Sequence, residues 1–224
     1  GGSMGGMQVL QWASAYPQRV FCALPIAAGT RHSSQNIAFH EVGRQAIMAD
    51  PAWHQGDYYQ HGTVPRAGLS VARMTAHITY LSEPALHRKF GRRLQNRAEV
   101  SYGFDADFQV ESYLRHQGEK FAGYFDANTY LYLVAGWTNY NLARDFGTTD
   151  YNEVFKKCSH QDYLVFSIDS DCCFYPDEQE FLRDKLIGAG LTTEYITVSS
   201  DKGHDSFLLE PELYAEPIRR MLEK

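Results

Sequence analysis

The stretch GGSMGG (Gly1–Gly6) contains the pattern G-x-S-x-G, in which a serine is flanked by glycines. In this pattern the serine occupies a strained turn, and the glycines remove side chains that would clash there. The helix that follows directs its N-terminus at the serine, so its N–H groups and dipole can stabilise an oxyanion. The pattern predicts a nucleophile at Ser3 with the backbone N–H of Met4 as oxyanion donor. A glycine-rich remnant of cloning is the alternative.

The residues after the serine predict a helix and then a strand. MQVLQWASAYP (Met7–Pro17) carries apolar residues at helical spacing and ends in a proline. RVFCALPI (Arg19–Ile26) is apolar and partly β-branched, which is typical of a buried strand. We therefore expect residues 1–26 to supply a nucleophile turn, a helix and a core strand of one domain.

The middle of the chain, residues 27–160, has helical periodicity and many aromatic residues. Ser82 is a candidate N-cap with Pro84 in the following first turn. The three clearest helical segments are Ile37–Met48, Leu69–Leu81 and Asp126–Trp137. This part predicts a helical insertion.

Alternating elements return over residues 161–224. Asp162–Ile168 and Glu194–Ser200 read as strands, and each is followed by a helix, Pro176–Gly190 and Pro211–Glu223. Alternation of this kind predicts a mostly parallel sheet with helices on both faces. The fold class is therefore α/β with a helical insertion.

Composition excludes several classes of function. The 224 residues carry a net charge of −6 and no basic stripe, which argues against binding nucleic acid. The apolar stretches are too short for a membrane span, and no segment resembles a signal peptide. The four cysteines have no disulfide-scaffold or zinc-site spacing, and no metal-binding motif is present. We expect a cytoplasmic protein without a metal.

A nucleophilic serine needs a base, and the base needs an acid that holds its tautomer. In hydrolases built on a parallel sheet, the acid follows a later strand and the histidine follows the next one. Asp169 and Asp171 follow the strand Asp162–Ile168, and His204 follows Glu194–Ser200. The chain thus provides a Ser-Asp-His order in which either aspartate can be the acid.

Several longer stretches resemble the homoserine O-acetyltransferase family of the α/β-hydrolase superfamily. The stretches run from the first residue to the last helix, and they are far more specific than G-x-S-x-G alone. They are GGSMGGMQ (Gly1–Gln8), AFHEVGRQAI with DPAW and GDYY (Ala38–Tyr59), GLSVARMTAHITYLSE (Gly68–Glu83), HRKFGRRLQ (His87–Gln95), FQVESYLRHQGEKFAGYFDANTYLYL (Phe108–Leu133), IDSDCCFYPDEQ (Ile168–Gln179) and GHDSFLLE (Gly203–Glu210).

The resemblance implies a ping-pong acyltransferase of methionine biosynthesis. Ser3 would take the acetyl group from acetyl-CoA, Asp171 would be the triad acid and His204 the base. L-Homoserine would then accept the acetyl group on its side-chain hydroxyl. Acetyl-CoA is a substrate here, and no bound cofactor is expected.

Three further residues would bind the amino acid. Arg73 and Tyr80 resemble the family's contacts to the substrate carboxylate, and Asp205 resembles the partner of its ammonium group. An arginine suits a carboxylate because its guanidinium forms two parallel hydrogen bonds. The helical insertion would act as a lid that excludes water and would form a homodimer.

Family members carry a long N-terminal half that supplies the first strands and the second oxyanion N–H. That half is absent from this chain, so we expect the chain alone to be inactive and poorly stable. Other functions stay open. The donor can be succinyl-CoA or the acceptor serine. The protein can also be a generic serine esterase, or a non-enzymatic interaction module built on the aromatic helices.

Overall fold

The computed structural model describes residues 1–223, which form two compact units. One unit contains Gly1–His32 and the segment from Asn139 onward, and the other contains Ser33–Thr138. The helical unit begins later and ends earlier than the insertion expected over residues 27–160. The reason is packing, because Leu142 and Phe155 are buried in the same core as Leu10 near the N-terminus.

The first unit is built on a parallel sheet of three strands in the order β1-β2-β3. These strands are β1 (Cys22–Ala23), β2 (Asp162–Ile168) and β3 (Thr192–Val198). Asp162 pairs with Cys22 on one side and with Thr192 on the other. The predicted parallel sheet is therefore confirmed.

The first strand is shorter than the expected Arg19–Ile26. Pro25 has no N–H to donate, so the regular ladder stops before it. Pairing resumes at Ile26, which forms parallel bridges with Phe166 and with Gly2. Phe21 also lies outside the core, with 65% of its surface exposed. Only the centre of the predicted strand is a regular strand.

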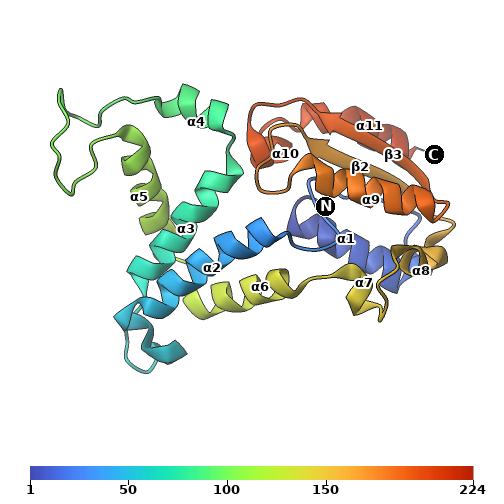
Figure 1. Cartoon of the computed structure of the whole chain (residues 1–224), viewed down its shortest axis with the longest axis horizontal. Helices are drawn as coiled ribbons and strands as arrows, with labels where there is room; N and C mark the ends of the chain where they lie inside the picture. Colours follow the sequence, from blue (N-terminus) through green and yellow to red (C-terminus); the bar gives the residue numbers. More distant parts are fainter. Residues whose placement is uncertain (224) are drawn as a thin grey trace. The chain divides into compact units, whose positions relative to one another are not determined.

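Helices cover both faces of the sheet, as Figure 1 shows for β2, β3, α9 and α11. Side chains of β2 alternate between two cores: Tyr163 and Val165 pack with Leu10 of α1, whereas Leu164 and Phe166 pack with Met221 of α11. Burial of each large apolar side chain stabilises the fold by roughly 1.5–3 kcal/mol. The helices of this unit are α1 (Met4–Ala15), α7 (Leu142–Asp145), α8 (Tyr151–Phe155), α9 (Pro176–Gly188), α10 (Ser206–Leu209) and α11 (Glu212–Leu222), with short 3-10 helices η1 (Pro17–Arg19), η3 (Lys156–Cys158) and η4 (Gly203–Asp205).

The second unit is a group of helices around a core that contains Ile47, Leu69 and Phe121. Gly68 and Gly118 sit where a Cβ atom would strike the neighbouring helix, so α3 approaches α2 and α5 closely. The helices are α2 (Ser34–Ala49), α3 (Arg66–Tyr80), α4 (Glu83–Phe90), α5 (Gln109–Ala122) and α6 (Ala127–Asn139), with the 3-10 helix η2 (Pro51–Gly56).

The predicted helix cap is confirmed, because the Ser82 side chain accepts a hydrogen bond from the Ala85 N–H. The three helical segments expected from periodicity correspond to α2, α3 and α6. Among the helices of residues 1–223, none is both long and apolar enough to cross a membrane.

Candidate active site

Ser3 sits in a sharp turn between a strand end and a helix. Its φ of 55° lies in the left-handed region, which non-glycine residues rarely adopt. The Ser3 N–H donates to the Ile26 carbonyl at 2.9 Å, and α1 begins at the next residue, Met4. Met4 therefore opens the helix N-terminus, where the dipole and N–H groups favour negative charge. This is the geometry that G-x-S-x-G predicts.

The glycines around Ser3 leave room at the turn, and a Cβ on Gly1, the first glycine of the pattern, would lie 2.6 Å from the Gly5 carbonyl oxygen. A Cβ on Gly5, the second glycine of the pattern, would meet no atom within 4 Å outside its own helix. A Cβ on Gly2 would lie 2.6 Å from the Phe207 ring, and one on Gly6 would lie 2.5 Å from the Ala28 side chain. Crowding at the turn therefore falls on Gly1 of the pattern and on the neighbouring Gly2 and Gly6, whereas Gly5 has room for a side chain.

His204 and Asp171 form a buried pair at the ends of β3 and β2. Nδ1 of His204 lies 2.8 Å from Oδ2 of Asp171, and these residues are only 3% and 2% exposed. Oδ1 of Asp171 accepts hydrogen bonds from the N–H groups of Cys173 and Phe174, at 2.8 and 2.9 Å. Because the carboxylate is held on both oxygens, it fixes the orientation of the histidine ring.

This pairing determines what the imidazole can do chemically. A carboxylate accepts, so Nδ1 of His204 carries the proton and Nε2 of the neutral ring keeps its lone pair. Phe174 stacks on the ring at 5.5 Å between centroids, and Phe207 meets it edge-on at 5.7 Å. The ring is thus held by a carboxylate and two aromatic side chains, which suits a general base.

Phe207 connects the histidine to the serine turn. The same ring that packs edge-on against His204 lies against Gly2, directly before Ser3. The fold therefore brings Ser3, Asp171 and His204 to the carboxyl-end edge of one parallel sheet, where ligands of such sheets bind.

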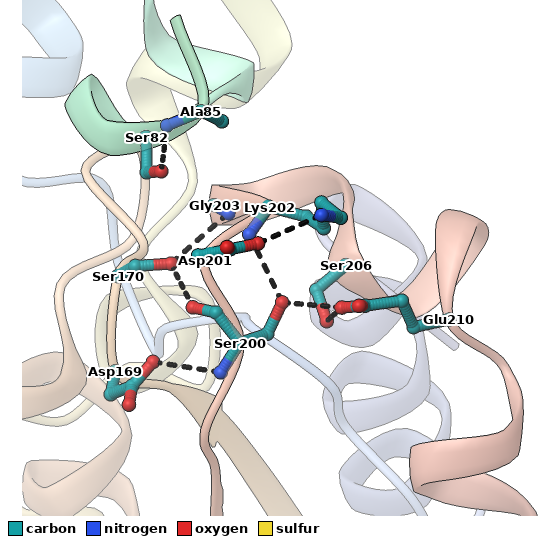
Figure 2. A network of polar contacts seen from close by, with 10 residues as sticks. All are labelled: Ser82, Ala85, Asp169, Ser170, Ser200, Asp201, Lys202, Gly203, Ser206 and Glu210. Carbon is teal, nitrogen blue, oxygen red and sulfur yellow. Dashed lines mark hydrogen bonds and ion pairs between the residues drawn. The ribbon is translucent and has the colours of Figure 1, made fainter. Parts of the chain in front are cut away.

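The loops that carry Asp171 and His204 are joined by hydrogen bonds (Figure 2). Ser170 Oγ donates to the Ser200 carbonyl and accepts from the Gly203 N–H, at 3.1 Å for the second contact. Asp169 Oδ1 accepts from the Ser200 N–H at 3.0 Å. Asp169 is therefore a loop-joining residue, and the aspartate that meets the histidine is Asp171.

The network continues into the segment after the histidine. Ser200 Oγ donates to Glu210, and Ser206 Oγ reaches the same carboxylate oxygen at 3.4 Å. Tyr214 of α11 donates to Ser206 Oγ at 2.9 Å. These contacts hold the segment on both sides of His204.

The remaining predicted residues have clear positions within their own units. Asp205 directly follows His204 in η4 and is half-buried. In the helical unit, the Arg73 guanidinium lies 5.6 Å from the centre of the Tyr80 ring. The structure thus joins Arg73 with Tyr80, and it joins Asp205 with the histidine loop.

Glu178 is a feature of the site that the sequence patterns did not indicate. It lies in the first turn of α9, and its Oε1 is buried without a hydrogen-bond partner among the described residues. Burial, followed by the charges of Asp177 and Asp171, raises the pKa of Glu178 from 4.5 to about 7. Acidic residues in the first turn of a helix are ordinarily stabilising. The raised pKa follows from burial and nearby carboxylates, which only the tertiary structure shows.

The aromatic contacts to His204 were also missed. Phe207 lies one helical turn after His204, so its spacing was a usable signal. Phe174 lies 30 residues away in sequence, and no local pattern links it to the histidine.

The neighbouring Cys172 has its pKa raised by burial and by Asp171, which keeps the thiol protonated, in keeping with a packing residue. Within residues 1–223, no group of three or more His, Cys, Asp or Glu side chains could hold a metal ion.

Comparison with known proteins places this geometry in context. The family profile of the α/β hydrolase fold matches residues 1–211. A homoserine O-acetyltransferase from Mesorhizobium japonicum is 58% identical over 216 residues, which are 96% of this chain and 55% of that protein. The chain thus spans about half the length of the curated relatives it matches.

Solved structures share the fold at lower identity. The crystal structure of homoserine O-acetyltransferase from Bacillus anthracis superposes with a TM-score of 0.91 at 20% identity, covering 100% of this chain and 59% of that one. An L374D mutant of esterase E22 superposes with a TM-score of 0.85 at 22% identity, covering 100% and 60%. At these identities the superpositions establish the fold alone.

Proposed function

Because the chain belongs to the α/β-hydrolase fold family, we propose that Ser3, His204 and Asp171 form the catalytic triad of an acyl-transfer enzyme. The observation that carries this proposal is the buried His204–Asp171 pair beside a serine held at positive φ. The strain at Ser3 costs free energy, and a buried ionisable pair is weak evidence for stability even when it is hydrogen-bonded. Such features persist where chemistry requires them.

The proposed reaction is transfer of an acetyl group from acetyl-CoA to L-homoserine. What supports this substrate pair is the 58% identity to a relative named homoserine O-acetyltransferase, spread over 96% of the chain. The reaction is proposed for the whole protein, because this chain spans about half the length of its curated relatives.

In the first half-reaction, His204 Nε2 takes the Ser3 proton while Oγ attacks the thioester carbonyl. The N-terminus of α1, beginning at Met4, stabilises the oxyanion. The C–S bond then breaks, and the coenzyme A sulfur leaves with the proton from His204. An acetyl ester on Ser3 remains.

In the second half-reaction, His204 accepts the proton of the homoserine hydroxyl, and that oxygen attacks the acetyl ester. The bond to Ser3 Oγ breaks, and Oγ regains a proton from His204. No net proton is gained or lost. Asp171 stabilises the imidazolium in both halves and holds the tautomer that leaves Nε2 as the base.

Recognition of the amino acid is assigned to three side chains. Arg73 and Tyr80 would bind the carboxylate, and Asp205 would bind the ammonium group. What supports Arg73 is its setting: within residues 1–223 it forms no ion pair, and its guanidinium lies over the Tyr80 and Phe121 rings.

The helical unit is also the proposed homodimer contact. Its exposed apolar side chains, including Val71 and Ile78, support this role.

The decisive experiment is mass spectrometry of the acyl-enzyme. The full-length protein is mixed with equal concentrations of acetyl-CoA and succinyl-CoA, without an acceptor. It is then digested into peptides for the measurement. We expect one acetyl group on the peptide that contains Ser3. Succinyl on that peptide would change the donor assignment, and no acyl group on Ser3 would refute the mechanism.

Substitution of the nucleophile tests the same mechanism by kinetics. Ser3→Ala keeps the Cβ and should therefore fold like the parent, while acetyl transfer falls on the order of 10⁴-fold or more. Ser159→Ala, at an exposed position, is the control and should leave activity unchanged. Full activity in Ser3→Ala would instead favour an interaction module.

Ester or thioester hydrolysis is the second candidate function. The observation in its favour is the buried His204–Asp171 pair with a strained serine, which hydrolysis requires as much as acyl transfer does. Water would then replace homoserine in the second half-reaction. Assay of the full-length protein with acetyl-CoA and homoserine separates the two functions, because a hydrolase would release acetate and form no O-acetylhomoserine.

A further inference from the structure

The side chain of Arg73 is held by a neighbour on its own helix. Nε of Arg73 donates to Nε2 of His77 at 3.1 Å, one turn further along α3. Among the described residues, Nε is the only side-chain nitrogen of Arg73 that donates a hydrogen bond. The two terminal nitrogens are therefore available to a ligand.

The opposite nitrogen of His77 is also engaged. Nδ1 lies 3.3 Å from the hydroxyl oxygen of Tyr113 on α5. Since Nε2 accepts from Arg73, the proton of a neutral His77 resides on Nδ1, and this nitrogen donates to Tyr113. The Arg73 N–H thus selects the tautomer with a lone pair on Nε2, and the Tyr113 hydroxyl holds the ring by accepting from Nδ1–H.

This arrangement requires that His77 be neutral, and its surroundings make it so. Burial, followed by the positive charges of Arg73 and Lys89, lowers the pKa of His77 from 6.5 to about 4. Tyr80 and Tyr113 pack edge-on against the ring, at 5.9 and 5.8 Å between centroids. At neutral pH the imidazole is therefore an acceptor, and it adds no charge beside the arginine.

Aromatic rings complete the setting of the guanidinium. The guanidinium carbon of Arg73 lies 5.0 Å from the centre of the Phe121 ring and 5.6 Å from that of Tyr80. Rings at these distances attract the cation without competing for its N–H groups. The arginine is positioned through Nε and the π face of its guanidinium. The two terminal nitrogens remain available to form paired hydrogen bonds with a carboxylate.

We propose that His77, oriented by Tyr113, is a positioning residue that makes the protein selective for acceptors bearing a carboxylate. This inference rests on the proposed function of Arg73 as the carboxylate contact. His77 touches neither substrate nor triad in this scheme. It acts by fixing Arg73 before the acceptor arrives, which reduces the ordering cost of binding.

The test compares two acceptors with the full-length protein. L-Homoserine carries the carboxylate, and 3-aminopropan-1-ol is the same molecule without it. For His77→Ala we expect kcat/KM for homoserine to fall about tenfold, the loss of one hydrogen bond to a charged group. The rate with 3-aminopropan-1-ol and the rate of acetyl-enzyme formation should not change.

His77→Gln should recover most of the selectivity, because its side-chain oxygen can accept from Arg73 as Nε2 does. His116→Ala, at an exposed histidine of α5, is the matched control. If kcat/KM of His77→Ala falls equally with both acceptors, His77 has a merely structural role and the proposal is overturned. So would an unchanged preference in His77→Ala.

Arg73→Ala distinguishes the role proposed for His77 from the role proposed for Arg73 as the carboxylate contact. If Arg73→Ala loses the preference for homoserine but His77→Ala keeps it, the arginine contact stands and the role of His77 is refuted. If Arg73→Ala keeps the preference, both are refuted. Should His77→Ala fail to fold, Tyr113→Phe decides the matter, with an expected loss of selectivity of about threefold and none if the proposal is wrong.

Discussion

Ser3 shows how much local strain the site tolerates at the scale of a single residue. A non-glycine residue at φ 55° costs on the order of 1–3 kcal/mol. Pairing of its N–H with the Ile26 carbonyl and the start of α1 at Met4 hold the turn in place. The strain is therefore supported by the sheet on one side and by the helix on the other.

Gly2→Ala should damage the site more than its small size suggests. The added methyl group would lie 2.6 Å from the Phe207 ring, which packs on His204. We expect a stability loss of about 1–3 kcal/mol, typical of overpacking, and a clear fall in kcat. Both are measured on the full-length protein, by denaturant unfolding and by steady-state kinetics.

Gly5→Ala is the matched control for that variant. Its Cβ would meet no atom within 4 Å outside its own helix, and alanine favours a helix over glycine. Stability should therefore stay the same or rise by up to about 1 kcal/mol. A greater loss at Gly5 than at Gly2 would contradict this account of the turn.

The loops after β2 and β3 act together at the scale of elements. Ser170 binds both the Ser200 carbonyl and the Gly203 N–H, so it joins the segment of Asp171 to that of His204. We expect Ser170→Ala to lower stability by about 1–2 kcal/mol and to lower kcat, because the histidine is less firmly placed.

Ser199→Ala is the comparison for this variant. It removes an exposed hydrogen bond between the same two loops, from Ser199 Oγ to Asp169. Its effect on stability should be smaller than that of Ser170→Ala. Unfolding midpoints and the rate of acetyl-enzyme formation measure both variants. If Ser170→Ala acylates as fast as the parent, the joining of the loops has no catalytic role.

Helix α9 carries a pH dependence in its first turn. The pKa of Glu178 is about 7 in the fold against an ordinary 4.5, so the folded state prefers the protonated carboxyl. Between these values the folded state binds more protons than the unfolded state, and stability falls as pH rises. The contribution is full below pH 4.5 and is lost as pH passes through about 7.

Glu178→Gln removes this dependence by keeping the side chain neutral. At pH 8 we expect the variant to be more stable than the parent by about 1 kcal/mol, allowing for solvent screening. At pH 4.5 the two should match. Glu180→Gln, at an exposed position of the same helix, is the control in urea unfolding series across pH. A difference that does not change with pH would refute the shifted pKa.

The sheet limits what this chain can do by itself at the scale of the whole molecule. Its three strands end at β3 on one side, while Gly2 pairs with Ile26 on the other. The chain spans about half the length of its curated relatives. Large apolar side chains such as Trp12 and Phe21 are 56% and 65% exposed. Such surfaces are typical of a fold that another segment covers.

We predict that the isolated 224-residue chain has no measurable acetyl transfer. The resemblance implies that the second oxyanion N–H and further strands come from the part of the relatives that this chain does not span. Purified chain with acetyl-CoA and homoserine, assayed by thiol release, measures this directly, and the full-length protein is the positive control. Turnover by the isolated chain would refute the prediction.

Local patterns in the sequence determined the parallel sheet, the main helices, the Ser82 cap and the turn at Ser3. These features depend on neighbouring residues, because periodicity and caps reflect backbone hydrogen bonds within one element. The order of serine, acid and histidine also followed from the succession of strands. The expectation of one regular strand over Arg19–Ile26 was wrong at both ends, since the regular strand is Cys22–Ala23 and Pro25 has no N–H for the ladder.

Only the tertiary structure decided which side chains meet. Asp169 and Asp171 follow the same strand, but the loop places Asp171 in hydrogen-bond contact with His204 and Asp169 in contact with Ser200. The crowded carboxyl of Glu178 and the approach of Tyr113 to His77 likewise join residues from different segments. Such contacts depend on crossovers and helix packing, and therefore on the whole arrangement of a unit, which no local pattern encodes.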